Sequence, residues 1–193
     1  GLSIDDFAAS LFTFLSAGLD VLEEVAKFRA ARRVWSDIVG DRYGATVPDS
    51  RALRIFAFSA GSSLTAQQPL NNVVRVTLAA LSAVLGSAQT LHTASFDEAF
   101  ATPTADAARL ALRTQQVIMA EAGVTGTADP LGGSWAIESL TADIARDVTA
   151  LLERIDERGG ALRCIADGWF VNQLEEGAYL DQLAVERGER EVV

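Results

Sequence analysis

The sequence contains almost none of the residues that build covalent cross-links and metal centres. Cys164 is its only cysteine and His92 its only histidine. A single cysteine excludes a disulfide within the chain. One histidine and one cysteine cannot assemble a multi-histidine or zinc site from this chain alone, so we predict no metal site here.

Long apolar runs and an excess of positive charge are also missing. No apolar run approaches the roughly 20 residues that a membrane-spanning helix needs. A formal net charge of −10 opposes both the phosphates of nucleic acid and anionic membrane surfaces, so we predict neither as a partner. Residues 1–6 lack the positive and apolar regions of a signal peptide. Together these absences predict a cytoplasmic protein.

What is present indicates a folded α/β chain. Strands are predicted at residues 11–15, 53–58 and 89–93, where short runs favour a pleated surface. Apolar residues at helical spacing predict helices at about 19–39, 71–85 and 104–123, and two or three more over 135–158 and 161–187. This alternation is typical of parallel βα units. Three parallel strands leave open edges, so we expect further strands from another chain, from self-association or from a rearranged fold.

The most specific sequence patterns lie between residues 59 and 104. They read SxxSLTxQxPxNNxxR at 59–75, QxLHT at 89–93, DEA at 97–99 and PT at 103–104. With EVAKFRAARRVW at 24–35 and DPLGGSWAIESLT at 129–141, they occur in an order and spacing that resemble the substrate barrel of the adenosylcobalamin-dependent acyl-CoA mutases. This family includes the methylmalonyl-CoA, isobutyryl-CoA and 2-hydroxyisobutyryl-CoA mutases.

The resemblance implies a part of a (β/α)₈ TIM-type barrel, which normally has eight strands in about 250 residues. Residues 1–128 would be its last three or so βα units, and 129–193 a C-terminal helical extension. The remaining strands and the cobalamin-binding domain would come from a partner chain, or the chain would form a homo-oligomer. The family's DxHxxG cobalt-ligating motif is absent here. Adenosylcobalamin would therefore be bound mainly by a separate domain or chain, or be lost. The final ERGEREVV is interpreted as a segment boundary.

Arg29 is the first candidate for substrate binding. The resemblance places it where the family has an arginine that contacts the phosphates of coenzyme A, to which a guanidinium offers several donors. Without the resemblance, Arg29 shares one helical face with Arg32 and Arg33, which is typical of a solvated, salt-bridged helix. In that interpretation the partners are Glu23, Glu24 and Asp37.

Four further residues match ligand-contacting positions of the family. Gln89 matches a glutamine that contacts the coenzyme A substrate, although it could equally be a satisfied polar residue at a strand start. Gly61, Glu98 and Ala99 match positions near the corrin ring, where a glycine allows close approach and a carboxylate can accept hydrogen bonds from side amides. Alone, Glu98 would be a capping or surface acid.

The histidine and asparagines of the motifs have simpler alternatives. His92 matches a family histidine, but a lone histidine on a strand is more often packed and hydrogen-bonded than catalytic. Asn71 and Asn72 also match, and their chemistry is consistent with helix capping.

The sequence departs from the family at the second strand. The family has a segment close to HxQTSG, whose histidine and glutamine reach the thioester; here these positions are Phe56 and Phe58. Two residues apart on a strand, they point to the same face, which by the family match is the lumen. Phe12 and Phe14 repeat the spacing. Further departures are Ala94 for a common asparagine and Ser62 for a common tryptophan.

Three functions remain open. The first is a segment or subunit of an acyl-CoA mutase-like isomerase that uses adenosylcobalamin. The second is a repurposed enzyme that acts without cobalamin on an apolar substrate, because two phenylalanines remove polar recognition worth on the order of 1–3 kcal/mol per contact. The third is a noncatalytic subunit that completes a barrel.

Overall fold

The computed structural model describes all 193 residues, and the chain divides into two compact units. Unit 1 spans Gly1–Arg146 and unit 2 spans Asp147–Val193. The boundary falls within the long helix α5, Trp135–Glu157. Unit 1 contains the sheet and all the motifs described above.

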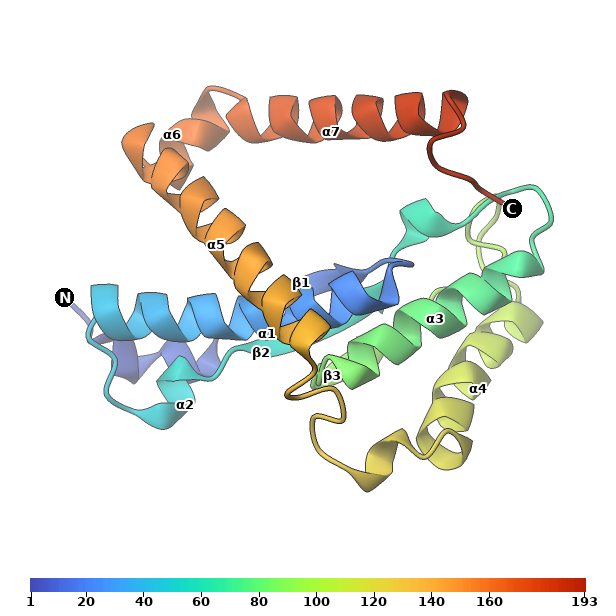
Figure 1. Ribbon diagram of the computed structural model, residues 1–193, viewed down its shortest axis with the longest axis horizontal. Helices are drawn as coiled ribbons and strands as arrows, with labels where there is room; N and C mark the ends of the chain where they lie inside the picture. Colours follow the sequence, from blue (N-terminus) through green and yellow to red (C-terminus); the bar gives the residue numbers. More distant parts are fainter. The chain divides into compact units, whose positions relative to one another are not determined.

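A parallel three-stranded sheet in the order β1-β2-β3 forms the centre of unit 1 (Figure 1). Its strands are β1, Phe12–Ala17, β2, Arg54–Ser59, and β3, Thr90–His92. The predicted α/β class and the three strands are confirmed. The third strand is shorter than predicted: it ends at His92, and the hydroxyl of the next residue, Thr93, donates to the carbonyl of Ala111.

The helices agree with the predicted pattern in place, with two exceptions. They are α1, Val21–Asp37; α2, Pro48–Arg51; α3, Asn71–Leu85; α4, Ala105–Glu121; α5; α6, Ala161–Ala166; and α7, Trp169–Glu186. The first helix continues into a π-helical turn, Ile38–Arg42, and the short α2 was not predicted. Three helices finish the chain, within the two or three predicted, because Gly168 takes a left-handed conformation with φ of 74° between α6 and α7.

Short 3-10 turns connect these elements. They are Ile4–Asp6, Ala8–Ser10, Gly61–Ser63 and Val124–Gly126. The first is held to the loop before α2, where the Asp5 carboxylate accepts hydrogen bonds from the N–H and hydroxyl of Thr46 at 3.0 and 2.8 Å. These bonds, the backbone N–H first, lower the pKa of Asp5 to about 2.

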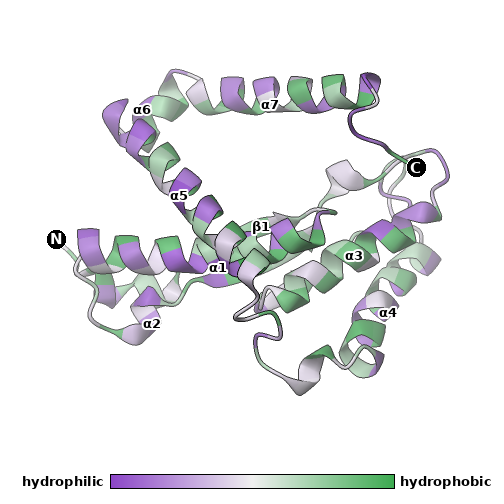
Figure 2. Ribbon diagram, viewed as in Figure 1, coloured by the Kyte–Doolittle hydropathy of each residue, from purple (hydrophilic) through white to green (hydrophobic).

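Helices α1 and α3 cover one face of the sheet and make the main core. The core residues are Ala17, Phe28, Leu53, Ile55, Ala57, Ala79 and Ala83. Small residues on α3 let it lie close to α1, and at its end a Cβ on Gly86 would come 2.7 Å from Phe28 Cδ2. Figure 2 shows α3 mainly in the hydrophobic range, as expected of a helix that packs on a sheet.

Unit 2 has a much smaller core. Cys164 on α6 is buried, whereas most of α7 is exposed. The Arg158 guanidinium lies 5.3 Å from the centre of the Trp169 ring and pairs with Asp167 at 3.5 Å. Exposed apolar side chains follow both helices: Leu162, Ile165, Val171, Leu174, Tyr179, Leu180 and Val185.

None of the helices combines the length and the apolar character that crossing a bilayer would require.

Candidate functional site

The sheet face opposite α1 and α3 has no helix on it and carries most of the aromatic side chains of the strands. We call this the open face; its residues are Phe12, Phe14, Ser16, Arg54, Phe56, Phe58, Thr90 and His92. Burial alternates along β2, where Ile55 and Ala57 are buried and their neighbours Phe56 and Phe58 are half-buried. Strand geometry therefore places Phe56 and Phe58 together on the open face.

The aromatic rings of the open face form a continuous row across two strands. The Phe12 and Phe14 ring centres are 5.4 Å apart, and those of Phe14 and Phe56 are 5.0 Å apart. Phe12 and Phe14 are 61% and 59% exposed. Phe58 is paired in register with His92 on β3. The open face thus has an apolar aromatic centre, with Ser16, Arg54, Thr90 and His92 around it.

Asn72 ties together the loops that follow β2 and β3. It is fully buried, its Oδ1 accepts from the N–H of Thr65 at 3.1 Å, and its Nδ2 donates to the carbonyls of Thr65 and Phe96 at 2.8 Å each. Arg75 donates to Asn72 Oδ1 and to Thr65 Oγ1. The interpretation of Asn72 as a helix cap was wrong; its Asn-x-x-Arg spacing builds a loop clamp instead.

Two more contacts fix the loop after β3. The N–H of Ala94 donates to the Ser59 hydroxyl at 2.8 Å, which joins this loop to the end of β2. The buried Asp97 carboxylate accepts from the N–H and hydroxyl of Thr104, both at 3.0 Å, while its other oxygen has no partner. Both loops therefore hold their shape at the carboxyl ends of the strands.

The structure brings the three residues matched to corrin contacts to this same end of the sheet. Gly61 follows β2 and is exposed, and a Cβ added there would meet nothing within 4 Å. Glu98 is exposed in the loop after β3, where one oxygen accepts from the N–H of Ser95 at 2.7 Å, and Ala99 is partly exposed. An accessible backbone and a carboxylate with a second, unused oxygen fit a large flat ligand that carries amides.

Arg29 lies on α1, in the helical layer on the other side of the sheet from Phe56 and Phe58. Its guanidinium contacts both oxygens of Asp129 at 2.5 Å and Glu138 at 2.6 Å. The partners predicted on its own helix were wrong, because the carboxylates come from about 100 residues further along the chain.

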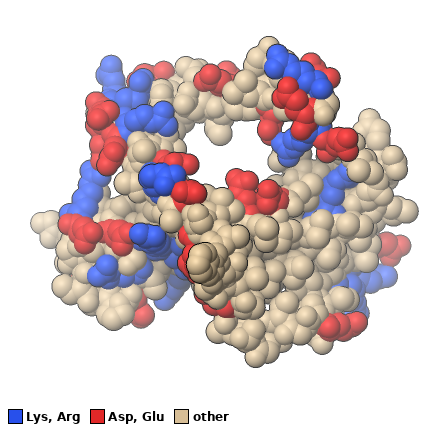
Figure 3. All heavy atoms as spheres, viewed as in Figure 1, with Lys and Arg blue, Asp and Glu red and all other residues tan.

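A polar surface cavity of about 330 Å³ surrounds this arginine. Its lining is Arg29, Arg32, Arg33, Asp129, Glu138 and Thr141. Arg32 donates to the carbonyl of Gly86 at 2.8 Å, and its burial, followed by repulsion from Arg29, lowers its pKa. Positive and negative side chains are mixed here; by contrast, Figure 3 shows a broad area without charged side chains over α3.

Gln89 and His92 stand at opposite ends of β3. Gln89 precedes the strand, where its Oε1 accepts from the N–H of Ile55 at 2.7 Å and its Nε2 donates to the carbonyl of Ser87 at 3.2 Å. His92 ends the strand and is exposed, and its imidazole makes no hydrogen bond or ion pair. The packed, hydrogen-bonded role predicted for His92 is therefore wrong.

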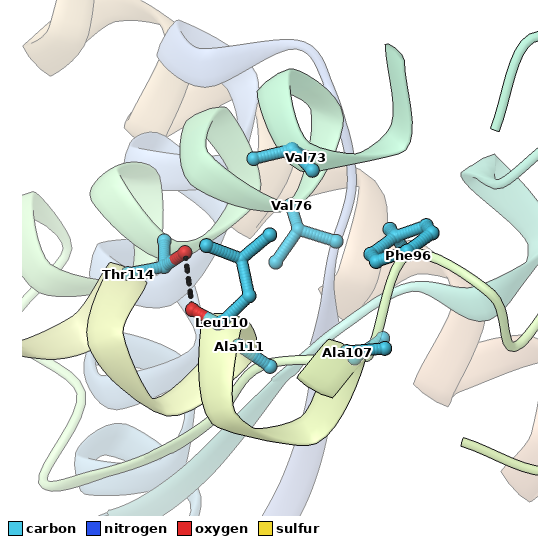
Figure 4. A pocket seen from close by; sticks show the side chains of 8 residues that line it. Val73, Val76, Phe96, Ala107, Leu110, Ala111 and Thr114 are labelled. Atoms are coloured by element: carbon cyan, nitrogen blue, oxygen red, sulfur yellow. Dashed lines mark hydrogen bonds between the residues drawn. The ribbon is translucent and has the colours of Figure 1, made fainter. Parts of the chain in front are cut away.

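A small apolar gap separates α3 from α4 (Figure 4). It is lined by Val73, Val76, Ala94, Phe96, Ala107, Leu110, Ala111 and Thr114, and its volume is about 10 Å³. A space of this size accommodates at most about one water molecule, and its apolar lining gives that water few partners. It is a packing gap beside Ala94, not a ligand site.

Comparison with known proteins identifies the class of protein to which this fold and these motifs belong. The family model described as methylmalonyl-CoA mutase matches residues 1–193, and the chain belongs to that family. The 2-hydroxyisobutanoyl-CoA mutase large subunit of Aquincola tertiaricarbonis is 47% identical over 100% of this chain and 34% of its own length. Methylmalonyl-CoA mutase of Escherichia coli is 45% identical over 100% of this chain and 27% of its length.

A more distant relative has the same coverage. The probable mitochondrial methylmalonyl-CoA mutase of Caenorhabditis elegans is 40% identical over 100% of this chain and 26% of its length. The chain thus spans about a quarter to a third of the length of the relatives that it matches.

Proposed function

We propose that this chain is a segment or subunit of an acyl-CoA mutase-like isomerase, in which it contributes the last three βα units of a (β/α)₈ barrel. The observation that carries the proposal is the match of the whole chain to the mutase family, combined with a parallel sheet whose aromatic face has no cover of its own. Residues 1–128 supply the βα units and 129–193 the helical extension. A partner chain, or further copies of this one, supplies the other strands.

In this proposal the open face lines the cavity that holds the acyl group. Phe56 and Phe58 pack against the acyl chain and exclude water from it, and Phe14 extends the apolar wall. Without donors at positions 56 and 58, this wall favours an apolar acyl group over one that carries a carboxylate, because a buried unpaired charge is strongly disfavoured.

Adenosylcobalamin is the proposed cofactor and supplies the hydrogen-abstraction chemistry of the rearrangement. Gly61, Glu98 and Ala99 would hold it at the carboxyl ends of β2 and β3: the glycine by leaving its backbone open, Glu98 by accepting hydrogen bonds from amides. The Asn72 clamp keeps both loops in position. The domain that ligates cobalt belongs to another segment or chain, and we place the reaction in the cytoplasm.

We propose Arg29 and Gln89 as the residues that contact coenzyme A. Both side chains already have partners within the chain, so the ligand has to displace these partners. A phosphate must displace Asp129 or Glu138 to reach Arg29, and a pantetheine amide must displace a backbone group to reach Gln89. A phosphate competes best for Arg29 if the side chains of Asp129 and Glu138 turn toward solvent, to which both are already about half exposed.

The test is to mix the chain, with any partner encoded beside it, with adenosylcobalamin and to record the visible spectrum of the cofactor. A spectral shift, with Gly61→Ala weakening binding and Gly126→Ala as the matched control, supports the proposal. Gly126 is also open around its Cβ position but lies away from β2 and β3.

A cobalamin-free enzyme on an apolar acyl substrate is the second candidate, favoured by Phe56 and Phe58 at the family's polar positions. Acyl-CoA binding without any change in the cofactor spectrum would select it. The third candidate, a noncatalytic subunit, requires that the assembly bind neither ligand through this chain.

A further inference from the structure

His92 is one of the polar side chains of the open face that border the aromatic row; the others are Ser16, Arg54 and Thr90. The Cα of His92 is paired with that of Phe58, and neighbouring strands are about 4.8 Å apart, so the two side chains project from the same face side by side. Arg54, the other ionisable residue of the face, lies at the opposite end of β2. Two polar side chains therefore flank Phe58, Ser16 on β1 and His92 on β3, and the imidazole is the longer of the two.

The backbone that carries His92 is firmly held, whereas its imidazole has no partner. The Thr93 hydroxyl donates to the carbonyl of Ala111 at 2.8 Å and accepts from Gln115 Nε2 at 2.9 Å. The next residue, Ala94, is anchored through its N–H to Ser59. A histidine fixed in this way, exposed and without a hydrogen bond, is positioned for a group that is not part of the chain.

We propose that His92 donates a hydrogen bond to the thioester carbonyl oxygen of the acyl substrate, and so determines how an acyl-CoA is held on a face that lacks polar groups at positions 56 and 58. The inference rests on the proposed function. An imidazole N–H is a donor in either protonation state of the ring when the tautomer is suitable. Beside Phe58 and Phe56 the bond forms in an environment poor in water, where a hydrogen bond is electrostatically stronger.

The experiment compares two ligands that differ only at the thioester oxygen. The ligands are an apolar acyl-CoA and the S-alkyl-CoA thioether with the same carbon skeleton, and binding to the full assembly is measured by calorimetry. His92→Phe should weaken the acyl-CoA about five- to tenfold and leave the thioether unchanged, because only the ester carries the acceptor. His92→Gln, which retains a donor, should recover much of the loss.

Arg109→Ala is the control, since Arg109 lies on α4, outside the open face, and pairs with Asp106 on the same helix. It should change neither affinity. An equal loss for ester and thioether in His92→Phe would assign the ring a packing role and overturn the proposal. So would an acyl-CoA affinity that is the same in His92→Phe and the unmodified protein.

A second measurement separates this inference from the proposed function. His92 is the only histidine of this chain, so selective ¹⁵N-histidine labelling of the chain within the assembly gives one imidazole signal set. The acyl-CoA should shift these resonances, and the thioether should shift them much less. Acyl-CoA binding without a shift overturns the role of His92 alone, whereas no acyl-CoA binding by the assembly overturns the proposed function and this inference with it.

Discussion

Asn72 is the residue on which the loops at the carboxyl ends of the strands most depend. Asn72→Ala removes three hydrogen bonds to the loops and leaves partly buried groups of Thr65 and Phe96 unpaired. We expect it to lower the free energy of unfolding by about 2–4 kcal/mol. Urea denaturation measures this, with the neighbour Asn71→Ala as control, because Asn71 makes only a 3.4 Å contact with Gln68. Equal effects of the two variants would show that the clamp adds no stability.

Replacing Arg29 measures how much its ion pairs with two carboxylates stabilise the fold. Because its side chain is mostly buried between Asp129 and Glu138, Arg29→Ala should destabilise the protein by about 1–2 kcal/mol, above the usual value of an exposed pair. Arg109→Ala, which breaks an exposed pair with Asp106, should cost less than about 0.5 kcal/mol. Thermal unfolding compares the two. A loss no larger than that of Arg109→Ala would show that the two ion pairs of Arg29 add no stability, and the acyl-CoA affinity of Arg29→Ala, measured separately, tests its contact with coenzyme A.

For single residues, the sequence predicts the strand face on which a side chain lies better than it predicts the groups that the side chain contacts. The shared face of Phe56 and Phe58 follows from strand periodicity, and the structure has them there. The partners of Arg29 do not follow, because the sequence gives no signal for a contact across about 100 residues. His92 is predicted to be packed, but the three residues of β3 do not indicate which groups its imidazole contacts.

At the scale of elements, the contact between α1 and the end of α3 limits side-chain size. Gly86→Ala would place a Cβ 2.7 Å from Phe28 Cδ2, against a ring at the centre of the core. We expect a loss of about 1–3 kcal/mol, the usual cost of overpacking. Gly61→Ala, with open space around the added Cβ, should change the free energy of unfolding by less than about 0.5 kcal/mol. Similar stabilities of the two variants would mean that α1 shifts freely on α3.

Helices and strands were largely predictable because each shows its own period and its own breaking residues. The residues at which these helices and strands begin and end were harder to predict. Helix α1 begins at the Asp20 cap, which accepts from the N–H of Glu23 at 3.2 Å, but it ends in a π turn that no sequence pattern announces. The break between α6 and α7 depends on the left-handed Gly168, where an apolar helical pattern continues on both sides.

The whole molecule exposes surfaces that the chain itself does not cover. β1 and β3 both have an unpaired edge, and Phe12 and Phe14 are mostly exposed. We therefore expect the isolated chain to associate, because unpaired strands and exposed apolar surface favour pairing with other chains. Size-exclusion chromatography with light scattering tests this. A monodisperse monomer that unfolds cooperatively would contradict it.

The most direct test of the central claim is the substrate preference of the complete assembly with adenosylcobalamin, measured over a panel of acyl-CoA esters. With Phe56 and Phe58 lining the acyl cavity, we expect turnover of an apolar acyl-CoA and little of methylmalonyl-CoA, and a shift toward polar acyl groups in the double variant Phe56→His, Phe58→Gln. Efficient isomerisation of methylmalonyl-CoA by the unmodified protein, unaffected by the double substitution, would show that these rings do not line the reacting centre.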